Sequence, residues 1–258
     1  SSPQHPPVRL GLRLVATLPE PSARRILVAR QHPPFTTTED LALRAALDAG
    51  DLKALAAADA LTALSGHRRQ QVWDASALHR APELLREAPT HELPLALIEA
   101  GEGEAIAHDY AATGLTLRRH PLALLRPRLA RWRLQTALQL VATPHGRQVR
   151  ACGIVTVRQR PGTAKGTMFV TLEDETGPVN VIVWPAMVDR WRNALLRSQL
   201  LAVEGLWQCS LPEGGHAHAT ASGQAPAVVR HLVAQRFKDL TPLLGRMAQA
   251  LQGSRDFH

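Results

Sequence analysis

The chain has 258 residues, of which 45% are hydrophobic, 20% are charged and 4% are aromatic. This length allows one large domain or two to three small ones, and the apolar content excludes wholesale disorder. The formal net charge is +8, and only three of the 30 basic residues are lysines. Arginine suits phosphate, so a polyanionic partner such as nucleic acid is indicated, although a genome rich in arginine codons gives the same count.

The cysteine pattern and the hydropathy exclude further classes. Cys152 and Cys209 stand alone without a CxxC motif, which excludes a zinc ribbon and suits a reducing compartment. No apolar run reaches the length of a membrane span and no signal peptide opens the chain, so we expect a cytoplasmic protein without a membrane partner. The start at Ser1-Ser2-Pro3 indicates a fragment or a processed piece.

Residues 1–80 read as short helices separated by turns. Thr36-Thr37-Thr38 precedes two acidic residues, which is typical of a helix N-terminus, and Ser65-Gly66 breaks the pattern before another helix. Such short helices need to pack in pairs, and the turns of helical hairpins can offer amides to a phosphate.

Residues 81–144 are predicted to form a helical connector. The segment 102–112 is helical in pattern, with Gly114 as its C-terminal stop, and a second helix is expected to begin at His120-Pro121. Arginines crowd the second half of the connector. A charge run of this kind is more often a solvated face than a binding site.

From residue 145 to 241 the pattern changes to alternation. Three predicted strands are followed by a helix that opens at Pro185, then by strands at 198–208 and 228–236, with a loop at 211–226 between them. In the first strand, valines alternate with a second set of residues that includes Thr156 and Arg158. This order is that of a five-stranded OB-fold barrel. The predicted class is therefore α+β: a small region of short paired helices, a helical connector, the barrel and a tail at 242–258.

If the valines fill the barrel, its outer face presents aromatic rings beside cations. We expect Phe169 and Trp184 to stack bases, although both could equally pack under the helix or against the connector. We expect the loop after the first strand to grip phosphate through its cations and amides, which belong to Arg158, Arg160, Gly162, Thr163 and Lys165.

Other chemistries fit the sequence poorly. RPGTAKGT lacks the order and the following helix of a P-loop. Glu173-Asp174-Glu175 reads as a turn rather than as metal ligands, because three successive carboxylates diverge. His216 and His218 lack a third ligand. We therefore predict neither a metal site nor a catalytic residue in this chain.

Several stretches resemble one family over most of the chain, from about Leu10 to His258. RQRPGTAKG, FVTLEDETG and VNVIVWP, followed by HLVAQRFKDLTPLLG and SRDFH, are similar to the C-terminal end of the error-prone DnaE-like DNA polymerase. PFTTTEDLALRA, LSGHRR and DYAATGLTLRRHP resemble the same family, the C-family (ImuC-type) translesion enzyme of bacteria.

The resemblance implies a DNA-directed DNA polymerase, a nucleotidyltransferase, whose catalytic palm and its Mg²⁺ lie outside this chain. It implies that the early helices are a helix-hairpin-helix region, in which Gly66, Arg68 and Arg69 are expected to approach a duplex backbone. It also implies that single-stranded template and primer-template DNA are bound, in damage-induced mutagenesis and translesion synthesis. The implied protein partners are a catalytically inactive Y-family polymerase homologue and a RecA-like accessory protein, with a sliding clamp engaged indirectly. In the family, glycine usually stands where this chain has Asp59, and the loop at 211–226 is usually shorter.

We therefore expect a non-catalytic DNA-binding part of an error-prone polymerase. The alternative is a docking module that recruits the mutagenesis partners. The two are distinguished by salt, since phosphate contacts weaken steeply with ionic strength whereas an apolar docking face does not.

Overall fold

The computed structural model describes residues 10–31, 33–77, 97–210 and 228–253. The chain forms two compact units, Ser1–Leu117 with Asp256–His258, and Arg118–Arg255. The division falls inside the segment 81–144 that was predicted as a connector. Each unit is described by itself below.

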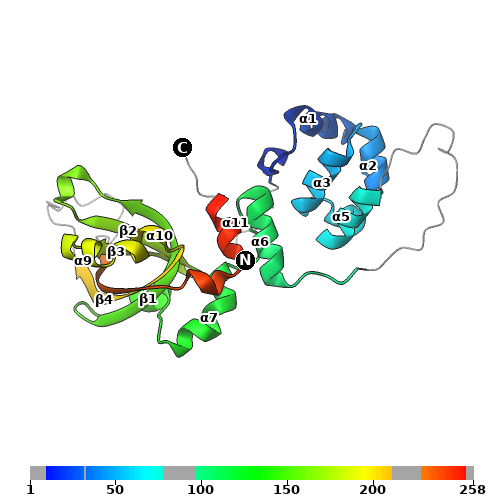
Figure 1. Ribbon diagram of the computed structural model, residues 1–258. Helices are drawn as coiled ribbons and strands as arrows, with labels where there is room; N and C mark the ends of the chain where they lie inside the picture. The colour runs from blue at the N-terminus through cyan, green and yellow to red at the C-terminus, as the bar shows by residue number, and fades with distance from the viewer. Residues whose placement is uncertain (1–9, 32, 78–96, 211–227, 254–258) are drawn as a thin grey trace, which may run out of the picture. The chain divides into compact units, whose positions relative to one another are not determined.

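The first unit is helical and contains six short α-helices in its described part (Figure 1). A 3₁₀ turn, η1 (Leu12–Leu14), precedes them, and they are α1 (Glu20–Ala29), α2 (Thr38–Arg44), α3 (Ala49–Ala57), α4 (Thr62–Ser65), α5 (Arg68–Ala77) and α6 (Glu102–Thr113). Helices this short are stabilised by packing rather than by propensity. The apolar faces of α1 to α5 share one core, which includes Ile26, Leu41, Leu52, Leu55 and Leu61.

The helix boundaries follow the expected capping chemistry. The Thr37 side chain accepts a hydrogen bond from the Asp40 amide at 3.0 Å, which begins α2. Asp48 and Asp51 form a reciprocal capping box at the start of α3. Gly114 takes the left-handed conformation, with φ of 73°, at the end of α6, where a side chain would be strained. The predicted caps at Thr37 and Gly114 are confirmed.

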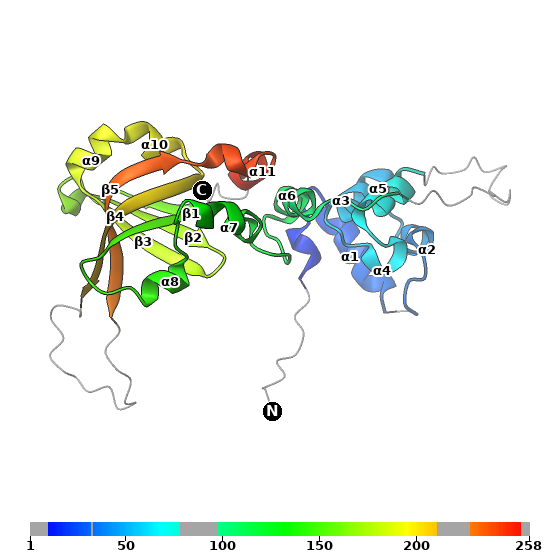
Figure 2. The same ribbon diagram turned by 90° about the horizontal axis from the view of Figure 1, so that it is seen from below.

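The second unit is a closed five-stranded barrel in the order β1-β2-β3-β5-β4 (Figure 2). Its strands are β1 (Gln148–Gln159), β2 (Met168–Asp174), β3 (Gly177–Val183), β4 (Leu200–Ser210) and β5 (Val229–Asp239). All neighbouring pairs are antiparallel except β3 and β5. The OB-type strand order predicted from the sequence is confirmed, although β5 runs three residues further than expected.

The second unit also contains short helices. They are α7 (Pro121–Arg131), α8 (Ala137–Val141), α9 (Pro185–Arg190), α10 (Arg192–Arg197) and α11 (Met247–Gly253), with 3₁₀ turns η3 (Gly162–Ala164) and η4 (Thr241–Leu244). The helix predicted after β3 is divided at Trp191 into α9 and α10. Val188 and Leu195 are nevertheless both buried against the barrel, as the shared helical face predicted.

The barrel interior is filled by the alternating apolar positions of all five strands. In β2 and β3 the buried apolar positions include Val170, Leu172, Val179, Val181 and Val183, and they alternate with more exposed neighbours. Closure brings β4 and β5 very close together at Gly205. A Cβ atom there would lie 2.0 Å from the Val233 carbonyl oxygen, so only glycine fits.

Candidate nucleic-acid interface

The outer face of β1, β2 and β3 carries the two predicted aromatic side chains. Phe169 is paired with Gln159 on one side and Ile182 on the other, and Trp184 directly follows β3. Phe169 is 39% exposed and Trp184 is 53% exposed, so neither ring is sealed beneath a helix. Exposed rings on a barrel face can stack successive bases of a single strand whatever their sequence.

The prediction that Arg158 shares this face is wrong. A β-bulge between Val155 and Val157 inserts one extra residue into β1, which reverses the alternation beyond it. Arg158 is consequently paired with Val170, an interior position. Its Nε donates to the Leu195 carbonyl oxygen at 2.6 Å, and its Nη2 donates to the Ser198 carbonyl oxygen, so the guanidinium ties β1 to the end of α10.

Val157 and Gln159 replace Arg158 on the outer face. Val157 is paired with Thr171 and is 39% exposed, and Gln159 is also exposed. Both were missed because the register was read as continuous alternation. The extra residue is Thr156, which interrupts a run of valines in the sequence. A single threonine in a strand does not by itself predict a bulge.

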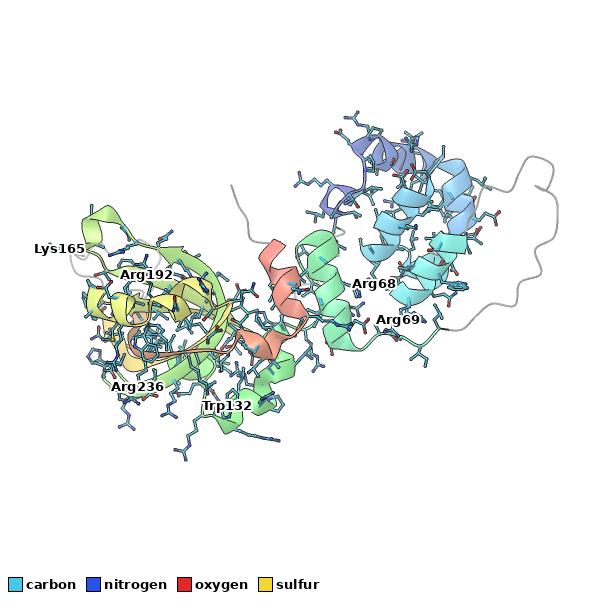
Figure 3. The ribbon with its side chains drawn as sticks, in the orientation of Figure 1. Arg68, Arg69, Trp132, Lys165, Arg192 and Arg236 are labelled. Carbon is cyan, nitrogen blue, oxygen red and sulfur yellow. The ribbon has the colours of Figure 1, made fainter. Side chains whose placement is uncertain are left out.

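Two of the three predicted cations, Arg160 and Lys165, lie exposed in the loop between β1 and β2, and Arg158 at the end of β1 is also exposed despite its hydrogen bonds. Arg160 and Lys165 form no hydrogen bond or ion pair with any residue that the structure describes. Gly162 and Thr163 are exposed in the turn η3 between them. The chain reverses through left-handed conformations at Lys165 and Gly166, with φ of 47° and 87°. Figure 3 shows Lys165 at the edge of the barrel, where it is accessible to a phosphate.

The acidic turn between β2 and β3 is structural. Asp174 Oδ1 accepts hydrogen bonds from the Thr176 amide at 2.7 Å and the Gly177 amide at 3.1 Å, and its Oδ2 accepts from the Ala137 amide at 2.7 Å. Glu175 accepts two hydrogen bonds from Arg126, one of them at 2.8 Å from Nη2. The carboxylates therefore diverge, as a turn requires.

Hydrogen bonding also affects the protonation of the Glu175 carboxyl group in this turn. Burial on its own raises the pKa of Glu175, but the hydrogen bond and the charge of Arg126 outweigh it and hold the pKa below its ordinary value. Burial raises the pKa of the nearby Cys152 thiol to about 12, so this cysteine stays protonated and unreactive.

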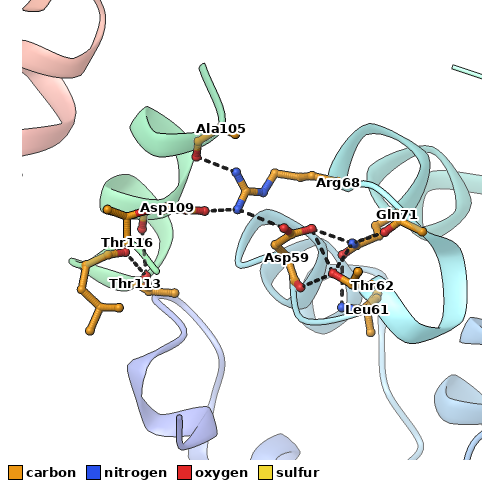
Figure 4. A network of polar contacts seen from close by, with 11 residues as sticks. Asp59, Leu61, Thr62, Arg68, Gln71, Ala105, Asp109, Thr113 and Thr116 are labelled. Atoms are coloured by element: carbon orange, nitrogen blue, oxygen red, sulfur yellow. Dashed lines mark hydrogen bonds and ion pairs between the residues drawn. The ribbon is translucent and has the colours of Figure 1, made fainter. Parts of the chain in front are cut away.

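In the helical unit, the predicted duplex contact at Arg68 needs a correction. Arg68 is only 9% exposed, and its Nη1 donates to the Ala105 carbonyl oxygen at 2.9 Å (Figure 4). Its Nη2 donates to Asp109 and lies 3.9 Å from Asp59 Oδ2. The guanidinium therefore joins α5 to α6 and is not presented to a ligand.

Gly66 and Arg69 remain accessible. Gly66 is exposed with φ of 71°, and a Cβ atom there would meet no atom within 4 Å. Arg69 is exposed and forms an ion pair with Glu104 at 3.0 Å, which is weak at a surface and easily exchanged for a phosphate. The predicted role of these two residues stays a prediction.

Asp59 occupies a backbone conformation that favours glycine. Its φ is 58°, in the turn between α3 and α4. The carboxylate is held toward the protein, since Oδ1 accepts from Gln71 Nε2 at 2.7 Å and from Thr62 Oγ1 at 3.3 Å. The glycine that the resembled family has at this position therefore matches the local geometry.

Some expectations fall on residues that are not described. His216, His218 and the loop at 211–226 lie there, as do residues 254–258 of the predicted 242–258 tail and residues 81–96 of the predicted connector. Among the described residues, no group of three or more His, Cys, Asp or Glu side chains could hold a metal ion. The Mg²⁺ implied by the resemblance thus has no set of ligands in that part of the chain. No helix within the described ranges is long and apolar enough to cross a membrane.

Comparison with known proteins agrees with this geometry. A family model described as a helix-hairpin-helix motif matches residues 2–71, and one described as an OB-fold nucleic acid binding domain matches residues 149–239. The chain is 50% identical over 256 residues to an error-prone DNA polymerase of Ralstonia nicotianae. It is 52% identical over 256 residues to an error-prone DNA polymerase of Bordetella parapertussis.

These alignments include 98% of this chain but only 22% and 23% of the two polymerases. The chain therefore spans about a fifth of the length of the curated relatives it matches. Among solved structures, asparaginyl-tRNA synthetase from Pyrococcus horikoshii is 20% identical, with 37% of this chain and 20% of that chain covered and a TM-score of 0.27. The resemblance to error-prone DNA polymerases found in the sequence is confirmed.

Proposed function

We propose that this chain, which is similar along nearly all its length to error-prone DNA polymerases, is the DNA-binding, non-catalytic part of such an enzyme. Single-stranded template would lie across the outer face of β1, β2 and β3. The observation that carries this proposal is the exposure of Phe169 and Trp184 on one barrel face, beside Arg160 and Lys165, which have no partner in the described part of the chain. Rings that stack bases and cations that follow the backbone together suit single-strand binding without sequence preference.

The helical unit is proposed to contact the duplex end of a primer-template. Gly66 and Arg69 supply an open backbone position and an exposed cation beside the turn before α5. Nucleotide transfer, with its Mg²⁺, belongs in this proposal to another part of the longer protein. Synthesis across a damaged template requires binding that does not depend on sequence, so we include a role in damage-induced mutagenesis. The proposed location is the cytoplasm.

The proposal is tested by fluorescence anisotropy with labelled oligothymidylate. Phe169→Ala and Trp184→Ala should each weaken binding roughly five- to a hundredfold, since stacking on an aromatic ring contributes about 1–3 kcal/mol per base. Arg160→Ala/Lys165→Ala should also reduce the salt dependence of the affinity. Leu138→Ala, an exposed apolar position on α8, is the matched control and should bind normally. Wild-type affinity in all the ring and loop variants would refute the assignment.

A docking role is the second candidate function. Leu138 and Val141 are 67% and 52% exposed on α8, and such apolar side chains suit a protein interface more than a phosphate backbone. The proposed partners are the inactive Y-family homologue and the RecA-like accessory protein. If this role dominates, Leu138→Ala should abolish capture of a purified partner at high salt while leaving DNA binding unchanged.

A further inference from the structure

A second basic surface lies where α7 ends against β1, β4 and β5. A shallow groove of about 480 Å³ opens there, and its lining includes Arg133, Gln135, Gln148, Arg150 and Glu204. This volume lies within the range of small-molecule sites and can accommodate a unit the size of a nucleotide. Glutamine side chains beside arginines provide both hydrogen-bond donors and acceptors at the surface.

The strand register extends the positive charge beyond the groove. Glu204 on β4 is paired with Arg150 on β1 and with Arg236 on β5, so the three side chains form one row across the barrel. Lys238 lies two residues beyond Arg236 on the same side of β5. Figure 3 shows Arg236 and Trp132 along the lower edge of the barrel and Lys165 at its upper left.

Trp132 adds an aromatic ring to this surface. The guanidinium carbon of Arg128 lies 5.4 Å from the ring centroid, and Lys238 Nζ lies 5.3 Å from it. The ring is 38% exposed. Cations held around an accessible ring are the combination found where proteins bind single strands.

Arg133 is presented to the groove by an unusual backbone conformation. Its φ is 55°, at the position after α7 where glycine is the common choice. An arginine is less favourable than glycine in this backbone conformation. The Arg133 side chain nevertheless lines the groove. Within the described part of the chain, the Arg133 and Arg236 guanidinium groups form no hydrogen bond or ion pair.

Among the residues that line the groove, all of them described, the acidic one is Glu204. It is paired with Arg150 at 3.0 Å, and both side chains are partly exposed. A pair of this kind contributes little to stability and can be exchanged for a ligand. The surface is therefore strongly positive. Two of its cations have no partner among the described residues, and a third, Arg150, can exchange its weak partner for a ligand.

We propose that this surface, which we call the Trp132 surface and define by Trp132, Arg133, Arg150, Arg236 and Lys238, is a second binding site for single-stranded nucleic acid. The cations neutralise backbone phosphates, and the groove and ring receive bases. Arginine forks match phosphate and carboxylate oxygens alike, so the choice of ligand rests on the ring and the glutamine amides. These groups suit the faces and edges of bases, which an acidic peptide lacks. The site does not depend on the face of β1, β2 and β3, because it is built at the opposite end of β1.

The test compares two double variants with the same loss of charge. Arg133→Ala/Arg236→Ala removes the two unpaired cations of the Trp132 surface, and Arg197→Ala/Arg246→Ala removes two exposed arginines elsewhere on the same unit. Anisotropy is measured between about 50 and 200 mM salt, where phosphate contacts dominate affinity. The labelled oligothymidylate has about 20 nucleotides, which exceeds the footprint of a single OB fold.

We expect the first double variant to lower the slope of log affinity against log salt by about 1.4, because each single-strand phosphate contact contributes about 0.7. The control double variant should keep the wild-type slope. Glu204→Gln should act in the opposite direction and tighten binding several-fold. Thermal denaturation of each variant checks that the barrel remains folded.

Three results would overturn the proposal. The first is an equal salt slope in the two double variants. The second is that Arg133→Ala/Arg236→Ala weakens binding to duplex DNA but not to oligothymidylate. The third is that this variant loses as much affinity for polyglutamate as for oligothymidylate under the same conditions. Failure of the Phe169 and Trp184 variants to weaken binding would refute only the first face. The Trp132 surface is tested independently by the salt slope of Arg133→Ala/Arg236→Ala, so either proposal can be refuted without the other.

Discussion

Arg68 on α5 donates to the carboxylate of Asp109 on α6, and both side chains are largely buried in the helical unit. Removing one member of a buried pair leaves the other charge without compensation. Arg68→Met should therefore lower the free energy of unfolding by about 3 kcal/mol. Urea denaturation followed by circular dichroism measures this change.

The control for that prediction is the neighbouring arginine. Arg69→Met removes an exposed pair with Glu104 and should cost less than about 1 kcal/mol. At a temperature where both variants are folded, Arg68→Met should keep the wild-type salt dependence of DNA binding. A reduced salt slope in folded Arg68→Met would show that this residue reaches phosphate after all.

Asp59 gives a second prediction, because different substitutions test its left-handed backbone conformation and its negative charge separately. Asparagine tolerates the left-handed conformation and can still accept from Gln71, so Asp59→Asn should change stability by no more than about 1 kcal/mol. It removes a negative charge beside the turn of the hairpin, so affinity for duplex DNA should rise. Denaturation and anisotropy with a labelled duplex measure the two effects.

Asp59→Ala serves as the comparison. Alanine is strained at φ of 58° and accepts no hydrogen bond, so it should be less stable than Asp59→Asn by about 1–2 kcal/mol. Equal duplex affinity in wild type and Asp59→Asn would mean that the turn does not approach DNA.

Most of the barrel could be predicted from the sequence because its signals are local. Valine alternation, turn residues such as Gly177 and the proline that opens α9 each act within a few positions. Arg158 could not be placed, since the bulge in β1 depends on how β2 is paired with it. Arg68 was misjudged for a similar reason, because its partner Asp109 is 41 residues away. Contacts between distant parts of the sequence decide whether an arginine has a structural role or is free to bind a ligand. The spacing of residues in the sequence does not predict such contacts.

The pair formed by Arg126 and Glu175 predicts a pH dependence of stability. The pKa of Glu175 is lower in the folded protein than its ordinary value of 4.5, because Arg126 bonds the carboxylate. A depressed pKa means that the unfolded chain binds the proton more readily. The stabilisation is therefore complete above about pH 4.5 and is lost as the pH falls through the folded pKa.

Glu175→Gln tests this linkage. The variant should be less stable at neutral pH by about 1.5–3 kcal/mol, the contribution of hydrogen bonds to a charged group. Its stability should also fall less than that of wild type when urea denaturation is repeated below about pH 4.5. Parallel curves for the two proteins across that range would contradict the linkage.

The close approach of β4 and β5 at Gly205 gives the last prediction. A Cβ atom at this position would lie 2.0 Å from the Val233 carbonyl oxygen and 3.0 Å from the Ala234 Cα. Both contacts are with backbone, so no side-chain rotation can relieve them, and Gly205→Ala should cost about 3 kcal/mol or more. Gly162→Ala is the matched control, since a Cβ atom there meets nothing within 4 Å. Because strand closure positions both proposed binding surfaces, Gly205→Ala should lose single-strand affinity in step with the loss of its folded fraction, measured by near-ultraviolet circular dichroism. Full affinity in a protein whose barrel has opened would show that the binding residues act without the fold that arranges them.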